Sequence, residues 1–175
     1  MTTQHSSLGT LVRRLLEALD GPVDALYKAE GLDFRPRYTP VLRILFQTGP
    51  CRIADLSERT GLSHSALSQT VSQMAREGWV VLAPGRDRRE RIVSAAPRAR
   101  EAHALLNKLW AQTARAAEGL DAVLPCPLEP VLAAALEALT QRSFSQRLRD
   151  AAGTPDSVPP SGLTTVDESE AGAKP

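Results

Sequence analysis

Between Ser63 and Arg76 the sequence concentrates side chains that donate and accept hydrogen bonds. On a helix advancing about 100° per residue, these side chains separate from the apolar ones and share one face. That face consists of small hydroxyls, two amides, one imidazole and one guanidinium: Ser65, Ser68, Ser72, Gln69, Gln73, His64 and Arg76. Serine is a poor helix former, so such a face lowers helix stability. The pattern therefore favours a helix that approaches a hydrogen-bonding partner closely.

The opposite side of the same helix is expected to pack inward. Its residues fall within roughly 140° of one another and are Ala66, Leu67, Thr70, Val71 and Met74. Ser63 is suited to cap the helix, because its hydroxyl can accept from an unpaired backbone N–H. Gly78 is expected to end it.

A shorter helix is predicted just before, over residues 53–60, and the pair forms a helix-turn-helix. Its inward side is expected to hold Ile53, Ala54 and Leu56. Gly61 stands where the chain leaves this helix, a position at which glycine adopts the left-handed conformation at low cost. Leu62 is expected to plug the turn between the helices.

A basic β-hairpin is predicted directly after the two helices. Residues 79–83 and 91–94 are rich in β-branched and apolar types, and Pro84-Gly85 marks a turn between them. Its tip carries Arg86, Arg88 and Arg89, with Asp87 placed to hold the Arg89 guanidinium by a bidentate pair. Arginine suits phosphate and the negative potential of a narrow minor groove. A charged ribbon in this place is typical of the wing of a DNA-binding domain.

The charge distribution supports a polyanionic partner. The 175-residue chain has a net charge of only +1, but residues 35–100 carry twelve arginines, no lysine and five acids, giving +7. This local excess matters because neutralising phosphates drives affinity for nucleic acid. A solvated charge run and an ordinary polar helix face are the alternatives when each feature is considered alone.

The flanking segments predict amphipathic helices. The expected segments are 8–19, a second one started by Asp20 and Pro22 and running to Glu30, then 41–47, 97–119 and 130–151. Wide apolar faces on the terminal helices favour a two-fold partner, a symmetry that palindromic DNA sites match. The alternative is that these helices only cover their own winged domain.

Residues 35–100 resemble the winged helix-turn-helix of the MarR family, the multiple antibiotic resistance regulators. The resemblance is carried by the run from Ile53 to Ser63, by Met-Ala-Arg-Glu-Gly at the end of the second helix, and by Asp87-Arg88-Arg89. Two positions depart from the family pattern: Gln69 replaces a frequent arginine, and Ala95-Ala96-Pro97 replaces Leu-Thr-Pro. The resemblance implies a helical homodimer, and a pocket for a small aromatic ligand between the winged lobe and the dimer helices.

We therefore predict a mainly α protein with a small β-wing. The expected divisions are N-terminal dimerisation helices at 1–34, a winged helix-turn-helix DNA-binding domain at 35–96, C-terminal dimerisation helices at 97–151 and a disordered tail at 152–175. Its function would be sequence-specific binding of double-stranded DNA at a pseudo-palindromic operator, as a transcription regulator and more often a repressor than an activator. A bound ligand would release the DNA by stabilising the conformations in which the spacing of the two lobes does not match the DNA.

Each candidate contact has an expected role. Ser65, Ser68 and Gln69 would face bases, and a glutamine amide can pair bidentately with adenine. His64 and Ser72 would position the helix on phosphates, and Ser63 belongs to the same DNA-binding set. At the hairpin tip, the backbone or minor groove would be engaged by Arg86, Arg88 and Arg89, with Asp87 orienting Arg89.

Other function classes receive little support from the sequence. Gly61 to Ser65 lacks the closing glycine of a nucleophile elbow, the three histidines show no zinc spacing, and no phosphate-binding loop occurs, so no enzyme, metal or cofactor is expected. Arg13 and Arg14 interrupt the first apolar run, no run is long enough for a membrane span, and two cysteines suit a reducing compartment, so a cytoplasmic protein is expected.

Two alternatives stay open. One is a winged-helix adaptor for protein interaction, which would show little affinity for duplex DNA. The other is a cysteine-based redox-sensing regulator, in which Cys51, just ahead of the helix-turn-helix, would be the reactive thiol.

Overall fold

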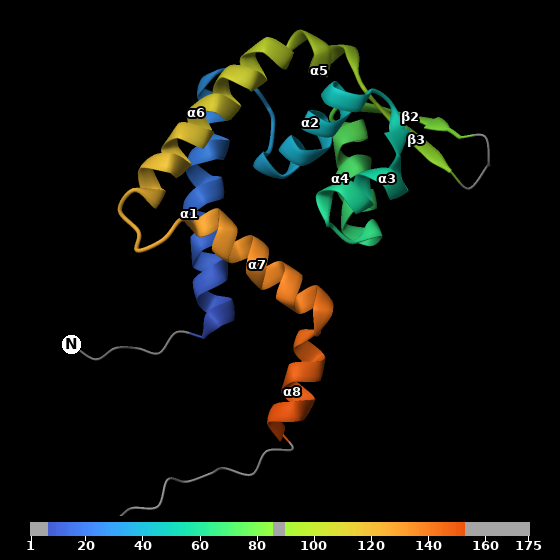
Figure 1. Ribbon diagram of the computed structural model, residues 1–175. Helices are drawn as coiled ribbons and strands as arrows, with labels where there is room; N and C mark the ends of the chain where they lie inside the picture. The colour runs from blue at the N-terminus through green and yellow to red at the C-terminus, as the bar shows by residue number, and fades with distance from the viewer. Residues whose placement is uncertain (1–6, 86–89, 153–175) are drawn as a thin grey trace, which may run out of the picture. The chain divides into compact units, whose positions relative to one another are not determined.

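The computed structural model describes residues 7–85 and 90–152, which form a set of helices and one small sheet (Figure 1). The chain divides into two compact units, Met1–Leu120 and Asp121–Pro175. The first unit contains α1 (Leu8–Ala29), the 3-10 helix η1 (Pro36–Tyr38), α2 (Thr39–Thr48), β1 (Cys51–Arg52), α3 (Ile53–Thr60), α4 (His64–Arg76), β2 (Val80–Pro84), β3 (Arg91–Ala95), α5 (Pro97–Glu101) and all of α6 (His103–Asp121) except its last residue. The second contains α7 (Leu128–Gln141) and α8 (Phe144–Ala152). None of the helices in the described ranges combines the length and apolarity that a membrane crossing requires.

The sheet has three antiparallel strands in the order β1-β3-β2. β2 pairs with β3 over its whole length, from Val80 opposite Ala95 to Pro84 opposite Arg91. This confirms the predicted hairpin, which projects from the domain in Figure 1. β1 pairs Cys51 with Val93 and was not predicted, because two residues give no alternating pattern to detect.

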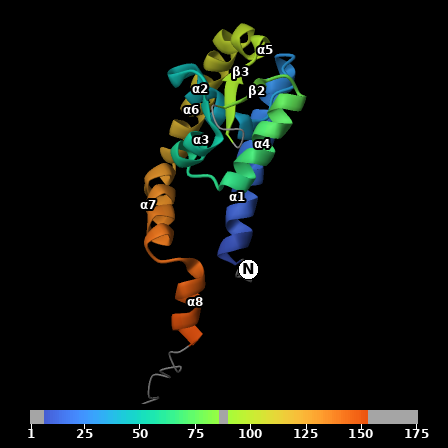
Figure 2. The ribbon, with the colours of Figure 1, turned by 90° about the vertical axis from the view of Figure 1, so that its right-hand side faces the viewer.

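The helix-turn-helix forms as predicted by its local signals. α3 spans the predicted residues, and Gly61 follows it with a φ of 68° in the left-handed region. Ser63 caps α4, its Oγ accepting from the Ala66 backbone N–H at 3.2 Å. Gly78, with a φ of 76°, lies just beyond the end of α4. Figure 2, viewed from the hairpin side, shows α3 and α4 on either side of the strands.

Three side chains expected to pack inward are exposed instead. Ala54 and Ala66 lie on the solvent side of their helices, and Leu62 retains 42% of its exposed area. The packing side of α4 is narrower than predicted and consists of Leu67, Val71 and Met74. An alanine methyl buries little apolar surface, so its side of a helix is decided by the neighbours that the fold supplies.

The predicted break at Pro22 does not occur, and α1 continues through it. Proline in a helix interior removes one hydrogen bond and costs about 3 kcal/mol. The segment after it packs Val23, Leu26 and Tyr27 against the core, and this burial offsets the cost.

The two predicted C-terminal helices are each interrupted. α5 and α6 meet at Ala102, and α7 ends at Gln141, before α8 begins at Phe144. The second break is stabilised by side chains, because Ser143 Oγ accepts from the Gln146 N–H at 3.3 Å and Arg147 donates to the carbonyl of Ala138 at 3.0 Å.

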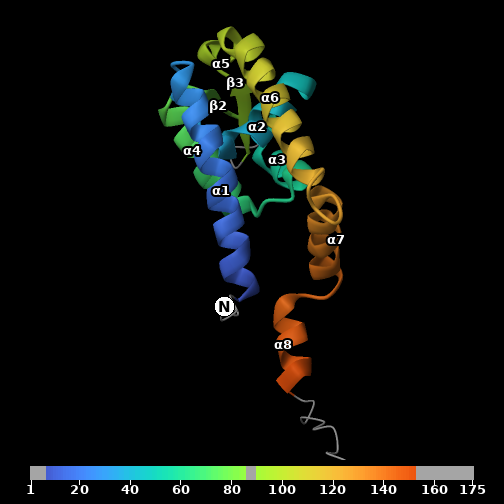
Figure 3. The same cartoon turned by 90° about the vertical axis from the view of Figure 1, so that its left-hand side faces the viewer.

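The core of the first unit lies where α1, η1, α4 and β2 converge. Tyr27, Phe34, Tyr38 and Trp79 are at most 1% exposed. Phe34 makes edge-to-face contacts with the other three rings, at centroid distances of 4.9, 5.6 and 4.9 Å. The cluster thereby joins the end of α1 to the winged domain. Figure 3 shows α1 and α6 in front of the domain, on either side of α2.

Apolar side chains remain exposed on the terminal helices. The first part of α1 exposes Leu8, Leu11, Val12, Leu16 and Leu19 by 42–73%. Neither α7 nor α8, both fully described, buries any side chain, and they expose Val131, Leu132, Leu136, Leu139, Phe144 and Leu148. Such faces are typical of surfaces that another chain covers.

Replacing Ser63 with alanine is expected to destabilise the protein by about 1 kcal/mol, because the α4 N-terminus loses its cap. Urea denaturation measures this loss. Ser65→Ala is the matched control, since Ser65 is exposed on the same helix and alanine has the higher helix propensity. Equal destabilisation by the two variants would contradict the capping role.

Candidate nucleic-acid interface

The outward face of α4 presents the side chains predicted to read DNA. Ser65, Gln69 and Ser72 are exposed and Ser68 is half-buried. His64 is exposed in the first turn. Ser63 differs from these, because its hydroxyl is engaged in capping the helix. The five residues other than Ser63 are thus available to a partner, as the helical spacing predicted.

A hollow of about 620 Å³ runs beside this face. It is lined by Arg37, Ala66, Ser68, Gln69, Thr70, Ser72, Gln73 and Arg76. Arg37 comes from η1 rather than from the helix-turn-helix, and the sequence analysis did not identify it as a contact. Its only sequence signal is the local excess of arginine. With Arg76, it brings two guanidinium groups to the lining of the hollow, and such groups suit the phosphates that flank a groove.

The base of the hairpin is held closed by backbone and side-chain contacts. The Gly85 N–H donates to the Glu90 carbonyl at 2.9 Å. The predicted wing contacts Arg86, Asp87, Arg88 and Arg89 lie outside the described residues. Their roles, including the pairing of Asp87 with Arg89, stay predictions.

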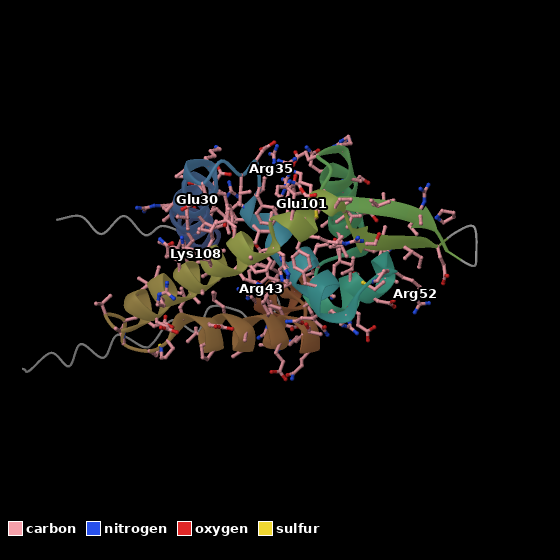
Figure 4. All side chains as sticks on the ribbon, turned by 90° about the horizontal axis from the view of Figure 1, so that it is seen from above. Glu30, Arg35, Arg43, Arg52, Glu101 and Lys108 are labelled. Atoms are coloured by element: carbon pink, nitrogen blue, oxygen red, sulfur yellow. The ribbon has the colours of Figure 1, made fainter. Side chains whose placement is uncertain are left out.

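Arg52 is a second basic residue beside the interface that no sequence pattern singled out. Its guanidinium donates to Asp55 at 3.1 and 2.8 Å and to Glu90 at 3.2 Å, and so links β1, α3 and the hairpin base. Hydrogen bonds from Arg52 lower the pKa of Asp55 below its ordinary value, which keeps the carboxylate ionised. Figure 4 labels Arg52 beside the hairpin. The network fixes the direction in which the hairpin leaves the domain.

Cys51 lies in β1 and is half-buried. Burial raises the pKa of its thiol, and the neighbouring charge of Asp55 raises it further. A raised pKa lowers the fraction of reactive thiolate at neutral pH. This environment gives the redox alternative less support than the DNA-binding interpretation.

A separate, largely apolar cavity of about 550 Å³ lies between α1, α2 and α6. Its lining includes Pro22, Val23, Tyr27 and Trp110. Arg43 and Asp20 bring one positive and one negative charge to the lining, and Arg43 stacks over Trp110 at 5.1 Å from the ring centroid. A largely apolar cavity with a few polar and charged groups suits a small organic molecule. Within the described residues, no group of three or more histidine, cysteine or acidic side chains could hold a metal ion.

Comparison with known proteins identifies one family. The family model described as MarR family matches residues 31–90, a range that contains α2 to α4 and the start of the wing. No curated protein sequence matches the chain.

Solved structures with a similar fold include M. tuberculosis transcriptional regulator MOSR in complex with DNA, 19% identical, with a TM-score of 0.59 over 85% of this chain and 100% of that chain. A MarR protein from Peptoclostridium difficile is 16% identical, with a TM-score of 0.56 over 86% and 95%. Bordetella bronchiseptica BpsR, whose DNA binding is regulated by 6-hydroxynicotinic acid, is 16% identical, with a TM-score of 0.55 over 89% and 99%. At these identities the likeness concerns the fold.

Proposed function

Because residues 31–90 make this chain a member of the MarR family, we propose that it binds double-stranded DNA as a sequence-specific transcription regulator, acting as a repressor. The observation that carries the proposal is the outward face of α4. This face offers hydroxyls and amides without a bulky apolar residue, and Arg37 and Arg76 line the hollow beside it. A helix of this kind fits the major groove, where base edges present donors and acceptors.

The contacts divide by chemistry. Ser65, Ser68 and Gln69 would face bases, whereas His64 and Ser72 would lie toward the backbone. The arginines of the hairpin tip, Arg86, Arg88 and Arg89, would reach phosphates or the minor groove. MOSR, which shares the fold, was solved in complex with DNA, and this likeness supports the same use of the surface here.

The proposal includes a homodimer. Exposed leucines on α1 and the unburied helices α7 and α8 supply apolar surface for a second copy. Two copies related by a two-fold axis would place their α4 helices on successive major grooves, roughly 34–36 Å apart. This proposal includes the domain boundaries predicted after residues 34, 96 and 151. It also includes the cytoplasm as the location of a chromosomal regulator. Sedimentation should then give twice the chain mass of 18.9 kDa.

The test of the function begins with sequence selection. Wild-type protein is incubated with a library of random duplexes, the bound fraction is amplified, and binding to the enriched duplex is measured at several salt concentrations. Enrichment of a pseudo-palindrome and a steep loss of affinity with salt are expected. A protein-interaction adaptor would enrich no sequence and would show no steep salt dependence.

Release of DNA by a small ligand is the finer part of the proposal. The cavity between α1, α2 and α6 has room for a small aromatic anion, with Arg43 as its counter-charge. BpsR responds to 6-hydroxynicotinic acid, so this acid and benzoate are suitable probes. Either one should release the enriched duplex when titrated into the complex. Failure of both would remove the ligand part and leave the DNA-binding part standing.

Arg37→Ala is expected to weaken binding to all duplexes alike and to flatten the slope of log affinity against log salt by about 1, since one phosphate contact is lost. Fluorescence anisotropy titrations between 50 and 200 mM salt, roughly the range where such slopes are resolved, measure this change. Arg115→Ala is the control, because Arg115 is an equally charged, exposed residue on α6. If both variants shift the slope equally, Arg37 has no specific contact.

A further inference from the structure

Glu77 follows the last residue of α4 and is enclosed by residues from other parts of the chain. Its side chain is only 14% exposed. The carboxylate accepts hydrogen bonds from Tyr38 Oη at 2.8 Å, from Arg35 Nη2 at 3.0 Å and from the Gln73 amide. Burial favours a higher pKa for Glu77, but bonds from Gln73 and Tyr38 and the charge of Arg35 outweigh it and lower that pKa, so the group is ionised.

An ionised acid is unfavourable at this position in two ways. The C-terminus of a helix carries partial negative charge, so a carboxylate there is repelled by the helix dipole. A carboxylate near a surface that binds phosphate also weakens the attraction to DNA. Neither helix stability nor overall charge therefore explains why an ionised glutamate occupies position 77. The three side chains that donate hydrogen bonds to it do explain this.

The contacts of Glu77 continue onto the outward face of α4. Gln73 donates to Glu77 and accepts in turn from the Arg76 guanidinium. Gln73 and Arg76 both line the hollow beside the reading face. The direction of the Arg76 side chain thus depends on Gln73, and that of Gln73 depends on Glu77.

The other partners of Glu77 connect it to the segment after α1. Arg35 directly precedes η1 and Tyr38 ends it, while Arg37 between them also lines the hollow. The Glu77 carbonyl also accepts from Arg98 of α5 at 2.7 Å. Figure 4 labels Arg35 on the side of the domain away from Arg52.

We propose that Glu77 is a positioning residue of the DNA interface, which fixes Gln73 and Arg76 on α4 relative to Arg37 on η1. The two arginines are thereby held at one spacing and engage the phosphates on either side of the groove that Gln69 reads. This inference deepens the proposed function and rests on it. It assigns to the end of α4 and to η1 a part in specific DNA recognition.

The direction in which Glu77→Gln changes DNA affinity separates this role from simple electrostatic repulsion. Glu77→Gln removes a negative charge. If Glu77 only repelled DNA, the variant protein would bind every duplex more tightly than wild type. A positioning residue gives the opposite result for the specific site, because Gln73 and Arg76 lose their orientation. The ratio of affinities for a specific and a random duplex therefore reports on positioning.

The experiment uses the full chain and two probes, the duplex that wild-type protein enriches from a random library and a duplex of shuffled sequence. We expect Glu77→Gln to lower the ratio of affinities about tenfold, a typical size for coupling between sites. Tyr38→Phe removes one hydrogen bond to Glu77 without changing charge and should lower the ratio in the same direction but less. Glu101→Gln, on α5 and exposed, should leave the ratio unchanged.

Thermal unfolding is recorded for every variant, and binding is compared well below the lowest transition. If Glu77→Gln does not fold, Tyr38→Phe carries the test, and an unchanged ratio in that variant overturns the proposal. If Glu77→Gln does fold, an unchanged ratio of affinities overturns the proposal. Tighter binding of that variant to both duplexes overturns it too. Failure of wild-type protein to enrich any sequence would instead overturn the proposed function itself.

Discussion

Replacing Trp79 with alanine is expected to destabilise the protein by about 3–5 kcal/mol, the largest effect of any single substitution considered, since a buried tryptophan leaves a large cavity. Its side chain is fully buried and contacts Phe34 edge-to-face at 4.9 Å. Its indole N–H donates to the Asp33 carbonyl at 2.9 Å, and Arg98 stacks over the ring at 4.3 Å. A domain of this size has only about 5–15 kcal/mol of stability, so much of the winged domain should unfold.

Trp79→Phe and Trp110→Phe make a matched pair that separates ring packing from hydrogen bonding. Both tryptophans are at least 95% buried, but the Trp110 N–H has no hydrogen-bond partner among the described residues. Trp79→Phe should therefore cost about 1–2 kcal/mol more, because the Asp33 carbonyl loses its donor. Urea denaturation followed by circular dichroism measures both. A larger loss in Trp110→Phe would show that the Asp33 bond is unimportant.

Gln69→Ala is expected to have the largest effect on sequence preference, about 1–3 kcal/mol at one base pair, as is typical for loss of a bidentate base contact. Gln69 is exposed and lies in the hollow beside the reading face. Its amide forms no hydrogen bond with the described residues, so both of its polar atoms are free to pair with adenine. Repeating the selection from random duplexes with the variant should relax one position of the enriched site.

Gln69→Arg gives a second outcome for the same position. Arginine pairs with guanine, so the preferred base should change rather than relax. Gln112→Ala, an exposed position on α6, is the control for glutamine loss elsewhere. An enriched site identical in wild type and both Gln69 variants would exclude base contact by this residue.

Local sequence signals were sufficient for the helix-turn-helix and the hairpin. Gly61, Ser63 and Gly78 mark boundaries through backbone freedom and capping, which depend on neighbours a few residues away. The same holds for β2 and β3, where β-branched runs flank a Pro-Gly turn. These elements formed at the predicted residues because the forces that set them act over short sequence distances.

Predictions failed where the deciding partner lay elsewhere in the chain. Whether Ala66 or Leu62 is buried depends on what packs against it, and the described residues leave both side chains exposed. Pro22 stays inside a helix because the core holds the next turn of α1. A two-residue strand such as β1 exists only because β3 offers it a partner. None of these partners is visible in a window of local sequence.

The sequence alone determined a reading helix, its polar face and an arginine-rich hairpin, because periodicity, capping and turn chemistry are local properties of the chain. Tertiary structure alone decided that Arg37 reaches the same hollow as Gln69, that Arg52 holds the hairpin base, and that Glu77 joins α4 to Arg35. These pairs are separated by 32, 38 and 42 residues. Contacts at such separations form only when the hydrophobic core brings distant segments together, and the energy that does so is spread over many residues rather than encoded at the contact itself.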